Sequence, residues 1–162
     1  MDAVEMLKQD HRLVEDLFRQ WEQAPAGQPE ARREIAERIV RELMVHERVE
    51  EEIFYPAFKK GAGEFGREEV DHSKEEHLLV DSLLGQLEEL DLEDPEFEAT
   101  FLTLKENVMH HVEDEETKMF PVARQVMADK LGPLADDMRQ YKASLTRQTE
   151  PRRQEDARRS RR

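Results

Sequence analysis

Apolar residues recur along the chain at intervals of three and four, the spacing that places them on one face of an α-helix. The first such run follows an N-capping pattern, Asp2 with Glu5, and ends at Pro25. Its apolar face comprises Val4, Leu7, His11, Val14, Phe18 and Trp21. The chain has no sustained alternation of apolar and polar residues and no Asn-Gly or Asp-Gly turn. The pattern therefore predicts helices and no strands.

Three further helical runs follow the first. The second begins near Pro29, which fits the first turn of a helix, and is expected to kink or end near Pro56. A glycine-containing loop, residues 61–66, precedes the third run, and the fourth runs from Asp94-Pro95 to an expected kink at Pro121. The predicted inward faces comprise Ile35, Ile39, Leu43, His46, Glu50 and Ile53; Val70, Ser73, His77, Val80, Leu84 and Leu87; and Phe101, Leu104, Val108, His111 and Glu115.

Long amphipathic helices joined by short loops predict an all-α fold, an up-down-up-down four-helix bundle. A short fifth helix, roughly residues 134–145, follows Gly132-Pro133 and is expected to cap the bundle. We therefore assign residues 1–130 to the bundle, 131–148 to the C-terminal helix and 149–162 to a basic, arginine-rich tail that is expected to be a solvated, disordered end.

The bundle sequence is repeated internally. Residues 44–56, MVHERVEEEIFYP, align on their proline with residues 109–121, MHHVEDEETKMFP, so the halves 1–65 and 66–130 are related by an implied pseudo-twofold axis. The repeated polar positions on the apolar faces are His11, His46 and Glu50 in the first half and His77, His111 and Glu115 in the second. Counting a rise of about 1.5 Å per residue from the loops places all four histidines at nearly one level of the bundle.

Six such side chains at one level favour a metal centre. A single histidine on an apolar face is more often a hydrogen-bonded core residue, but two buried carboxylates repel each other and lose hydration unless cations compensate. We expect Glu50 and Glu115 to bridge two ions, each of which is also bound by the two histidines of one half. Four nitrogens and two carboxylates suit iron or manganese and tolerate zinc or copper. With an oxo or hydroxo bridge, each ion would keep a position for a small molecule.

Composition excludes several other classes of protein. The absence of cysteine excludes disulfides, thiolate metal sites and cysteine nucleophiles. With no apolar run long enough for a membrane span and no signal peptide, we expect a cytoplasmic protein. The net charge of −14 argues against a nucleic-acid-binding core, and only the arginine-rich tail could contact RNA, DNA, an acidic partner or another protein. HERVE lacks the second histidine of HExxH, and only Glu69 with His72 fits the ferritin-like Glu-x-x-His spacing.

The pattern His…His-x-x-x-Glu…His…His-x-x-x-Glu, followed by FYP and MFP, resembles the hemerythrin-like, or HHE cation-binding, family across about residues 1–130. That resemblance implies a four-helix bundle with a non-haem di-iron centre held by the six repeated side chains. Oxygen-carrying hemerythrins have a further histidine one turn before the position of His77, where this chain has Ser73. The chain is therefore similar to the bacterial branch with a reduced ligand set, which implies reactions with peroxide or nitric oxide, or a redox response, in place of oxygen carriage.

Three further residues are candidates for minor roles near this site. Tyr55, as a phenol, could act as a ligand or electron donor, but nine residues after His46 a regular helix would point it away from the site, so a core or surface position is favoured. Ser73 occupies the position of the missing histidine. His72 lies about 140° around the helix from His77, which argues against a substitute-ligand role. The other acidic residues near the two glutamates are interpreted as a solvated face, from which one could support a ligand histidine; they are Glu51, Glu52, Glu113, Asp114 and Glu116.

Three functions fit these observations. The first is a di-iron protein, with manganese or zinc as alternatives, that reacts with hydrogen peroxide, O2 or NO and decomposes peroxide as a catalase does. The second is an iron, redox or gas sensor without turnover, whose partner surface would involve the C-terminal helix and tail. The third is a metal-free bundle with a polar core, for which chelation would leave the melting temperature unchanged.

Overall fold

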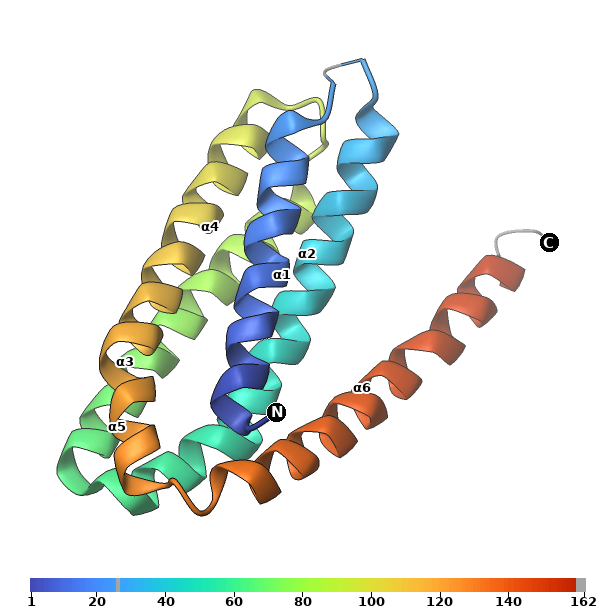
Figure 1. The fold of residues 1–162 in the computed structure, drawn as a ribbon. Helices are drawn as coiled ribbons and strands as arrows, with labels where there is room; N and C mark the ends of the chain where they lie inside the picture. Colours follow the sequence, from blue (N-terminus) through green and yellow to red (C-terminus); the bar gives the residue numbers. More distant parts are fainter. Residues whose placement is uncertain (26, 160–162) are drawn as a thin grey trace.

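The computed structural model describes the backbone of residues 1–25 and 27–159 and the side chains of residues 1–25 and 27–148. Four long helical rods lie side by side and alternate in direction (Figure 1), which confirms the predicted all-α bundle. No strand occurs among the described residues. The elements are α1 (Ala3–Gln23), α2 (Pro29–Val49), the π-helical turn η1 (Glu50–Phe54), α3 (Tyr55–Glu89), α4 (Pro95–Asp114), the π-helical turn η2 (Glu115–Met119), α5 (Phe120–Val126) and α6 (Leu131–Arg159).

Two helix starts follow the capping signals in the sequence. The Asp2 side chain accepts from the backbone N–H of Glu5, whose carboxylate accepts in return from the N–H of Asp2, so α1 begins with a complete capping box. Asp94 accepts from the backbone N–H of Glu96 at the start of α4. These bonds fix where the first and fourth rods begin, and therefore the level that their histidines reach.

The connection between the second and third rods is tighter than predicted. The expected loop over residues 61–66 is wrong, because only Gly63 leaves the helical conformation, at φ 61° and ψ −133°. Glycine adopts this left-handed backbone without the steric cost that a Cβ would bring. Gly66 is also constrained, since a Cβ there would lie 2.9 Å from the Cβ of Ala62 and 3.1 Å from the carbonyl oxygen of Phe58. Glycine marks the break in the sequence but does not give its length.

The predicted kinks at the two prolines are replaced by π-helical turns that precede them. η1 begins at Glu50 and η2 at Glu115, so each wide turn starts at one of the repeated glutamates. Pro56 and Pro121 then lie in the first turn of the helices that follow, where their missing N–H is tolerated. π-helical turns are rare and frequent at functional sites, because the extra residue re-aims the side chains beyond it.

Two apolar clusters pack the interior on opposite sides of the histidine level. One lies toward the two short loops and includes Trp21 stacked on Phe101, with ring centroids 4.1 Å apart. The other lies toward α5 and α6 and includes Phe54, Phe58 and Met138. The polar side chains of the histidine level are therefore sealed above and below by hydrocarbon.

The C-terminal helix departs most from expectation. It was predicted over residues 134–145 as a short cap, but α6 extends over Leu131–Arg159. It contacts α1, α2 and η1, and its C-terminal end projects away from the bundle (Figure 1). Arg, Gln, Glu and Ala, which dominate residues 152–159, have good helix propensities, and this explains a helix without an apolar stripe. The prediction of a disordered tail is wrong for residues 149–159, and residues 160–162 lie outside the described part. Among the described helices, none is long and apolar enough to cross a membrane.

Candidate metal centre

The structure brings all six repeated side chains together in the core. The four imidazoles are at most 6% exposed, and Glu50 and Glu115 are 0% and 1% exposed. One histidine comes from each of α1, α2, α3 and α4, and each glutamate opens a π-helical turn. The predicted convergence at one level is confirmed, whereas the role of these residues as metal ligands stays a prediction.

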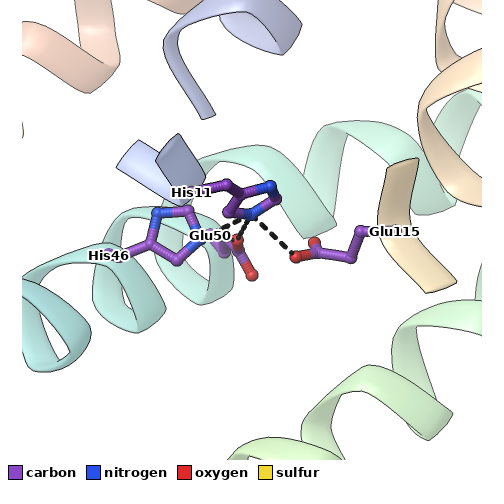
Figure 2. A group of neighbouring side chains, drawn as sticks. All are labelled: His11, His46, Glu50 and Glu115. Atoms are coloured by element: carbon purple, nitrogen blue, oxygen red, sulfur yellow. Dashed lines mark hydrogen bonds and ion pairs between the residues drawn. The ribbon is translucent and has the colours of Figure 1, made fainter. Parts of the chain in front are cut away.

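The histidines of the first half face each other. His11 Nε2 lies 3.2 Å from His46 Nε2, and the carboxylates of Glu50 and Glu115 approach the same point (Figure 2). His11 Nε2 is 3.9 Å from Glu50 Oε1 and 3.4 Å from Glu115 Oε1, while His46 Nε2 is in close contact with Glu50 Oε1. All of these atoms lie within 4.8 Å of one another, a spacing that fits ligands around one cation.

The histidines of the second half repeat this arrangement. His77 Nε2 lies 3.1 Å from His111 Nε2, and Glu50 Oε2 is 3.2 Å from the first and 3.7 Å from the second. Glu50 therefore reaches one histidine pair with each oxygen, the arrangement expected of a bridging carboxylate. Glu115 reaches both pairs with a single oxygen, since its Oε1 is 2.9 Å from His111 Nε2 and 3.4 Å from His11 Nε2.

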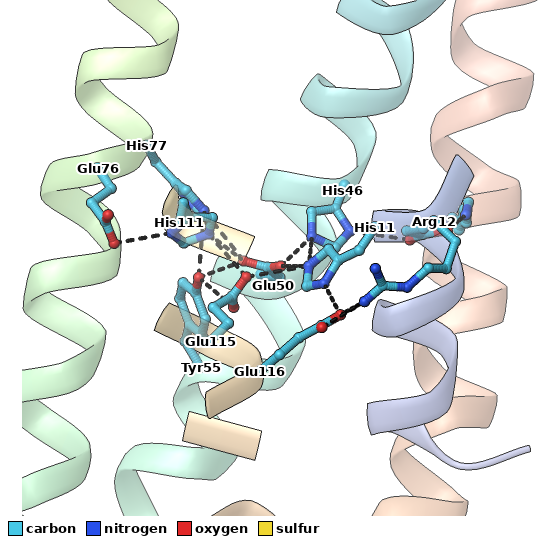
Figure 3. A network of polar contacts seen from close by, with 12 residues as sticks. His11, Arg12, His46, Glu50, Tyr55, Glu76, His77, His111, Glu115 and Glu116 are labelled. Carbon is cyan, nitrogen blue, oxygen red and sulfur yellow. Dashed lines mark hydrogen bonds and ion pairs between the residues drawn. The ribbon is translucent and has the colours of Figure 1, made fainter. Parts of the chain in front are cut away.

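Each of the four clustered histidines is held from outside by a carboxylate at its Nδ1. The distances are 3.1 Å from His46 to Asp10, 3.0 Å from His77 to Glu51, 3.1 Å from His111 to Glu76 and 3.0 Å from His11 to Glu116. Each rod supplies the carboxylate for the histidine of the next rod, and the fourth supplies the first, so these contacts form a closed ring around the bundle. Figure 3 shows two of them, from Glu76 to His111 and from Glu116 to His11.

This carboxylate ring was only partly foreseen. Glu51 and Glu116 belong to the acidic face from which one supporting carboxylate was expected. Both contact a histidine, and their side chains remain 39% and 20% exposed, respectively. Asp10 and Glu76 were not singled out. The signal that could have found them is an acidic residue directly before a repeated histidine in each half. A carboxylate at Nδ1 fixes the ring orientation and directs Nε2 inward, as is common for metal-binding histidines.

Tyr55 lies in the site, contrary to prediction. Its hydroxyl donates to Glu50 Oε2, is 3.1 Å from Glu115 Oε2 and lies 3.4 Å from His77 Nε2 (Figure 3). The cause is η1: the backbone N–H of Tyr55 donates to the carbonyl of Glu50, five residues earlier, and so the two side chains share a face. A regular helix would have placed them well apart.

Ser73 and His72 have different surroundings. Ser73 is buried, and its hydroxyl lies near enough to Tyr55 to act on the pKa of the phenol in the lowering direction. The side chain of His72 is 52% exposed and lies near Glu76 and Asp114, outside the buried cluster. The expectation that His72 does not replace the missing histidine agrees with this position.

Charge in the cluster is balanced by protons when no metal is present. Burial alone would lower the pKa of His46, but Glu50 and Asp10 raise it to about 9. Burial is likewise outweighed at His11 and His111, where the carboxylates raise the pKa well above its usual range. Conversely, burial raises and His46 lowers the pKa of Glu50, and the histidines prevail. Cations that replace these protons would perform the same neutralisation.

The donor set fits metal ions by a second criterion. Glu50 Oε1 and Glu115 Oε1 are buried and accept no hydrogen bond, although imidazole nitrogens lie close to each. A buried acceptor without a hydrogen bond is costly unless another positive partner faces it. Both oxygens point at the space between the histidine pairs, where cations would satisfy them.

A small cavity adjoins the four histidines on the side away from Tyr55. It has a volume of about 20 Å³, and its apolar lining includes Val14, Leu43, Val80 and Val108. A cavity of this size holds one molecule about as large as water. The site is thus bordered by a phenol on one side and by a small apolar space on the other.

Fold and site together define a helical-bundle protein with a candidate cation-binding centre built from facing helices. The sequence matches the Hemerythrin HHE cation binding domain over residues 2–123, which is most of the chain. The protein belongs to this family, and the resemblance inferred from the sequence motifs is confirmed.

Individual relatives agree with this assignment. A crystal structure of a hemerythrin HHE cation-binding domain-containing protein from Mycobacterium kansasii has a TM-score of 0.74 and 27% identity, covering 89% of each chain. A protein named DNA nickase from a Nostoc species is 29% identical over 76% of this chain and 34% of its own length. An uncharacterized hemerythrin-like protein of Schizosaccharomyces pombe is 28% identical over 57% and 45%, respectively. The chain thus spans less than half of these two relatives.

Proposed function

We propose that the protein holds two iron ions and reacts with a small oxidant, hydrogen peroxide, O2 or NO, with catalase-like decomposition of peroxide as its turnover. The two ions would be held by His11 with His46 and by His77 with His111, spanned by Glu50 and Glu115. One observation carries the proposal: each oxygen of Glu50 faces a different histidine pair. Bound iron would supply redox chemistry; manganese or zinc would fit the same donors, but zinc is redox-inert.

The residues around the centre restrict what can react there. The cavity of about 20 Å³ holds one molecule about as large as water, which favours a small reactant over a larger substrate. Tyr55 places a hydroxyl within 3.4 Å of His77 Nε2, where it can donate a hydrogen bond to a carboxylate or to a small ligand. Burial and the charges of Glu115 and Glu50 raise the pKa of Tyr55 well above its usual range, which keeps the proton on the phenol.

The test is metal loading followed by reaction with peroxide. Protein reconstituted with Fe²⁺ and oxidised should contain about two irons per chain, show an oxo-bridge visible band that azide alters, and evolve one O2 for every two peroxides consumed. Metal uptake should release protons below about pH 9, because the His46 pKa is raised to about 9. An iron-loaded protein that leaves peroxide unchanged would remove the enzymatic part of the proposal.

A regulatory role is the second candidate, favoured by a contact between the site and α6. Asp10, which holds His46, also receives Lys142 Nζ of α6 at 2.7 Å. A shift of His46 on metal binding or oxidation would therefore be transmitted to α6 through one carboxylate. Hydrogen exchange in α6 should differ between metal-loaded and metal-free protein, and deletion of residues 149–162 should abolish partner capture without changing the visible spectrum. The net charge of −14 gives no support to a nucleic-acid partner.

A further inference from the structure

Asp10 and Glu76 are equivalent in the repeat, but they differ in what they face outside the bundle. The outward oxygen of Asp10 is neutralised by Lys142 Nζ at 2.7 Å, on the side that α6 covers. Glu76 holds His111 in the same way that Asp10 holds His46. No lysine or arginine pairs with Glu76 among the described side chains, which extend to residue 148.

Two histidines and a second carboxylate surround Glu76 instead. His72 Nε2 is 3.5 Å from Glu76 Oε1 and 3.5 Å from Asp114 Oδ2. His110 Nε2 is 3.8 Å from Glu76 Oε2 and 3.4 Å from Asp114 Oδ2. The four residues form two i,i+4 pairs, His72 with Glu76 on α3 and His110 with Asp114 on α4, and the two helices are in contact.

The repeat shows that these residues are particular to the second half. The positions equivalent to His72, His110 and Asp114 are Met6, Val45 and Val49. These three pack into the apolar cluster that also includes residues of α6. The first half therefore has hydrocarbon at these three positions, and α6 adds Lys142, where the second half has two imidazoles and a carboxylate.

We propose that His72, Glu76, His110 and Asp114 form a second, surface site for a divalent cation, distinct from the buried centre. Two imidazoles and two carboxylates are a donor set for Zn²⁺ and similar first-row ions. His72, Glu76 and Asp114 already offer ligand atoms within 4.8 Å of one another. The cation would take the place at Glu76 that the Lys142 ammonium takes at Asp10.

Exposure and neighbouring charge fit this role. The side chains of Glu76 and Asp114 are each 14% exposed and held by neighbours, whereas those of His72 and His110 are 52% and 67% exposed and can turn toward an ion. Lys118 pairs with Asp114 through Oδ1 at 3.3 Å, which leaves Oδ2, the oxygen facing the histidines, available. Glu76 joins the two sites, because the same carboxylate holds His111.

The experiment is a Co²⁺ titration of the full chain with its buried centre loaded with ferric iron. Wild type should bind one additional Co²⁺ per chain and develop the visible absorption of imidazole-bound Co²⁺. His72→Asn with His110→Asn should lose this ion, or bind it at least about tenfold more weakly, with the iron spectrum unchanged. Asp114→Asn should weaken binding in the same direction.

Glu113→Gln is the matched control, because Glu113 is an exposed acid beside Asp114 with no part in the cluster. The proposal is overturned if the double histidine variant binds Co²⁺ as wild type does, or if Glu113→Gln weakens binding equally. Of the four substituted positions, His72, His110 and Glu113 are exposed and Asp114 is partly buried, and circular dichroism and the iron spectrum of each variant check its folding. An iron-loaded protein inert toward peroxide would contradict the proposed turnover without affecting this titration.

Discussion

The two halves of the repeat place different rings at equivalent positions beside the candidate centre. Tyr55 stacks on His77 with ring centroids 5.7 Å apart, and Phe120 stacks on His11 at 5.8 Å. Both rings follow a π-helical turn and precede a proline, so the local backbone structure is the same in the two halves. Only the phenol brings a hydroxyl to the carboxylates. The repeat gives the two histidine pairs the same backbone surroundings, and single side chains then make the surroundings of the two pairs chemically different.

The largest effect should come from the carboxylate that spans both halves. Glu50→Ala removes a side chain that contacts all four histidines, and metal affinity should fall more than about 100-fold at both positions. Glu115→Ala should lower metal affinity about tenfold, because Glu115 contacts two of the four histidines, His11 and His111. Metal analysis after dialysis measures both, and Glu52→Ala, at an exposed position, is the control. Equal losses for the two glutamates would contradict this ranking.

The carboxylates behind the histidines should rank second. Asp10→Asn and Glu76→Gln keep the size of each side chain and remove its charge, which should lower metal affinity by about 10–100-fold. Asp10→Asn should also reduce stability by about 0.5–1 kcal/mol, because Lys142 loses its ionic partner. Competition with a chelator and urea unfolding measure the two quantities. If Asp10→Asn lowers stability equally in the wild type and in a Lys142→Met background, the lost ion pair with the lysine is not the cause.

Exchange of the two rings tests whether the hydroxyl matters to reactivity. Tyr55→Phe makes the halves alike and should slow peroxide consumption about tenfold, the effect of one lost hydrogen bond, without lowering iron content. The reciprocal change, Phe120→Tyr, serves as the control for ring polarity at the equivalent position. Stopped-flow measurement of peroxide loss gives the rates. If Tyr55→Phe retains the full rate, the phenol has only a packing role.

The last prediction concerns stability in place of metal binding or reactivity, through a buried acid that only the first half has. Glu47 is 8% exposed, and burial with a hydrogen bond to Asp81 raises its pKa from 4.5 to about 10. The unfolded chain ionises above 4.5 while the folded chain stays protonated, so this group makes the fold less stable as pH rises toward 10. Val112 occupies the equivalent position.

Glu47→Val should therefore stabilise the metal-free protein by about 1–2 kcal/mol at about pH 8, and the gain should shrink toward about pH 5. Urea unfolding at the two pH values measures the gain. Glu34→Gln, an exposed change on α2, is the matched control and should shift neither value. A gain independent of pH would mean that packing, and not ionisation, is responsible.

The bundle and the six clustered side chains could be predicted because both depend on regular spacing. Apolar residues at intervals of three and four define the rods, and the repeat places His11 and His77 at matching levels. Convergence of side chains then follows from helix geometry alone. Regular spacing in the sequence is therefore sufficient to predict the histidine cluster.

The incorrect predictions concern segments in which the spacing of apolar residues is irregular or carries no information. Tyr55 was placed away from the site because the π-helical turn beginning at Glu50 adds a residue that no apolar pattern reveals. The turn at Gly63 was predicted too long, since glycine signals a break without its extent. α6 was predicted too short because its charged C-terminal half has no apolar face, and only helix propensity marks it.

The closed ring of carboxylate–histidine contacts also opposes sliding of the rods relative to one another along the bundle axis. A slide of one rod by a single turn would separate its histidine from the carboxylate of one neighbour and its own carboxylate from the histidine of the other. Two contacts are lost for every rod that moves, whichever rod it is. Under a pulling force along the helix axes, this level of the molecule should be the last to shear.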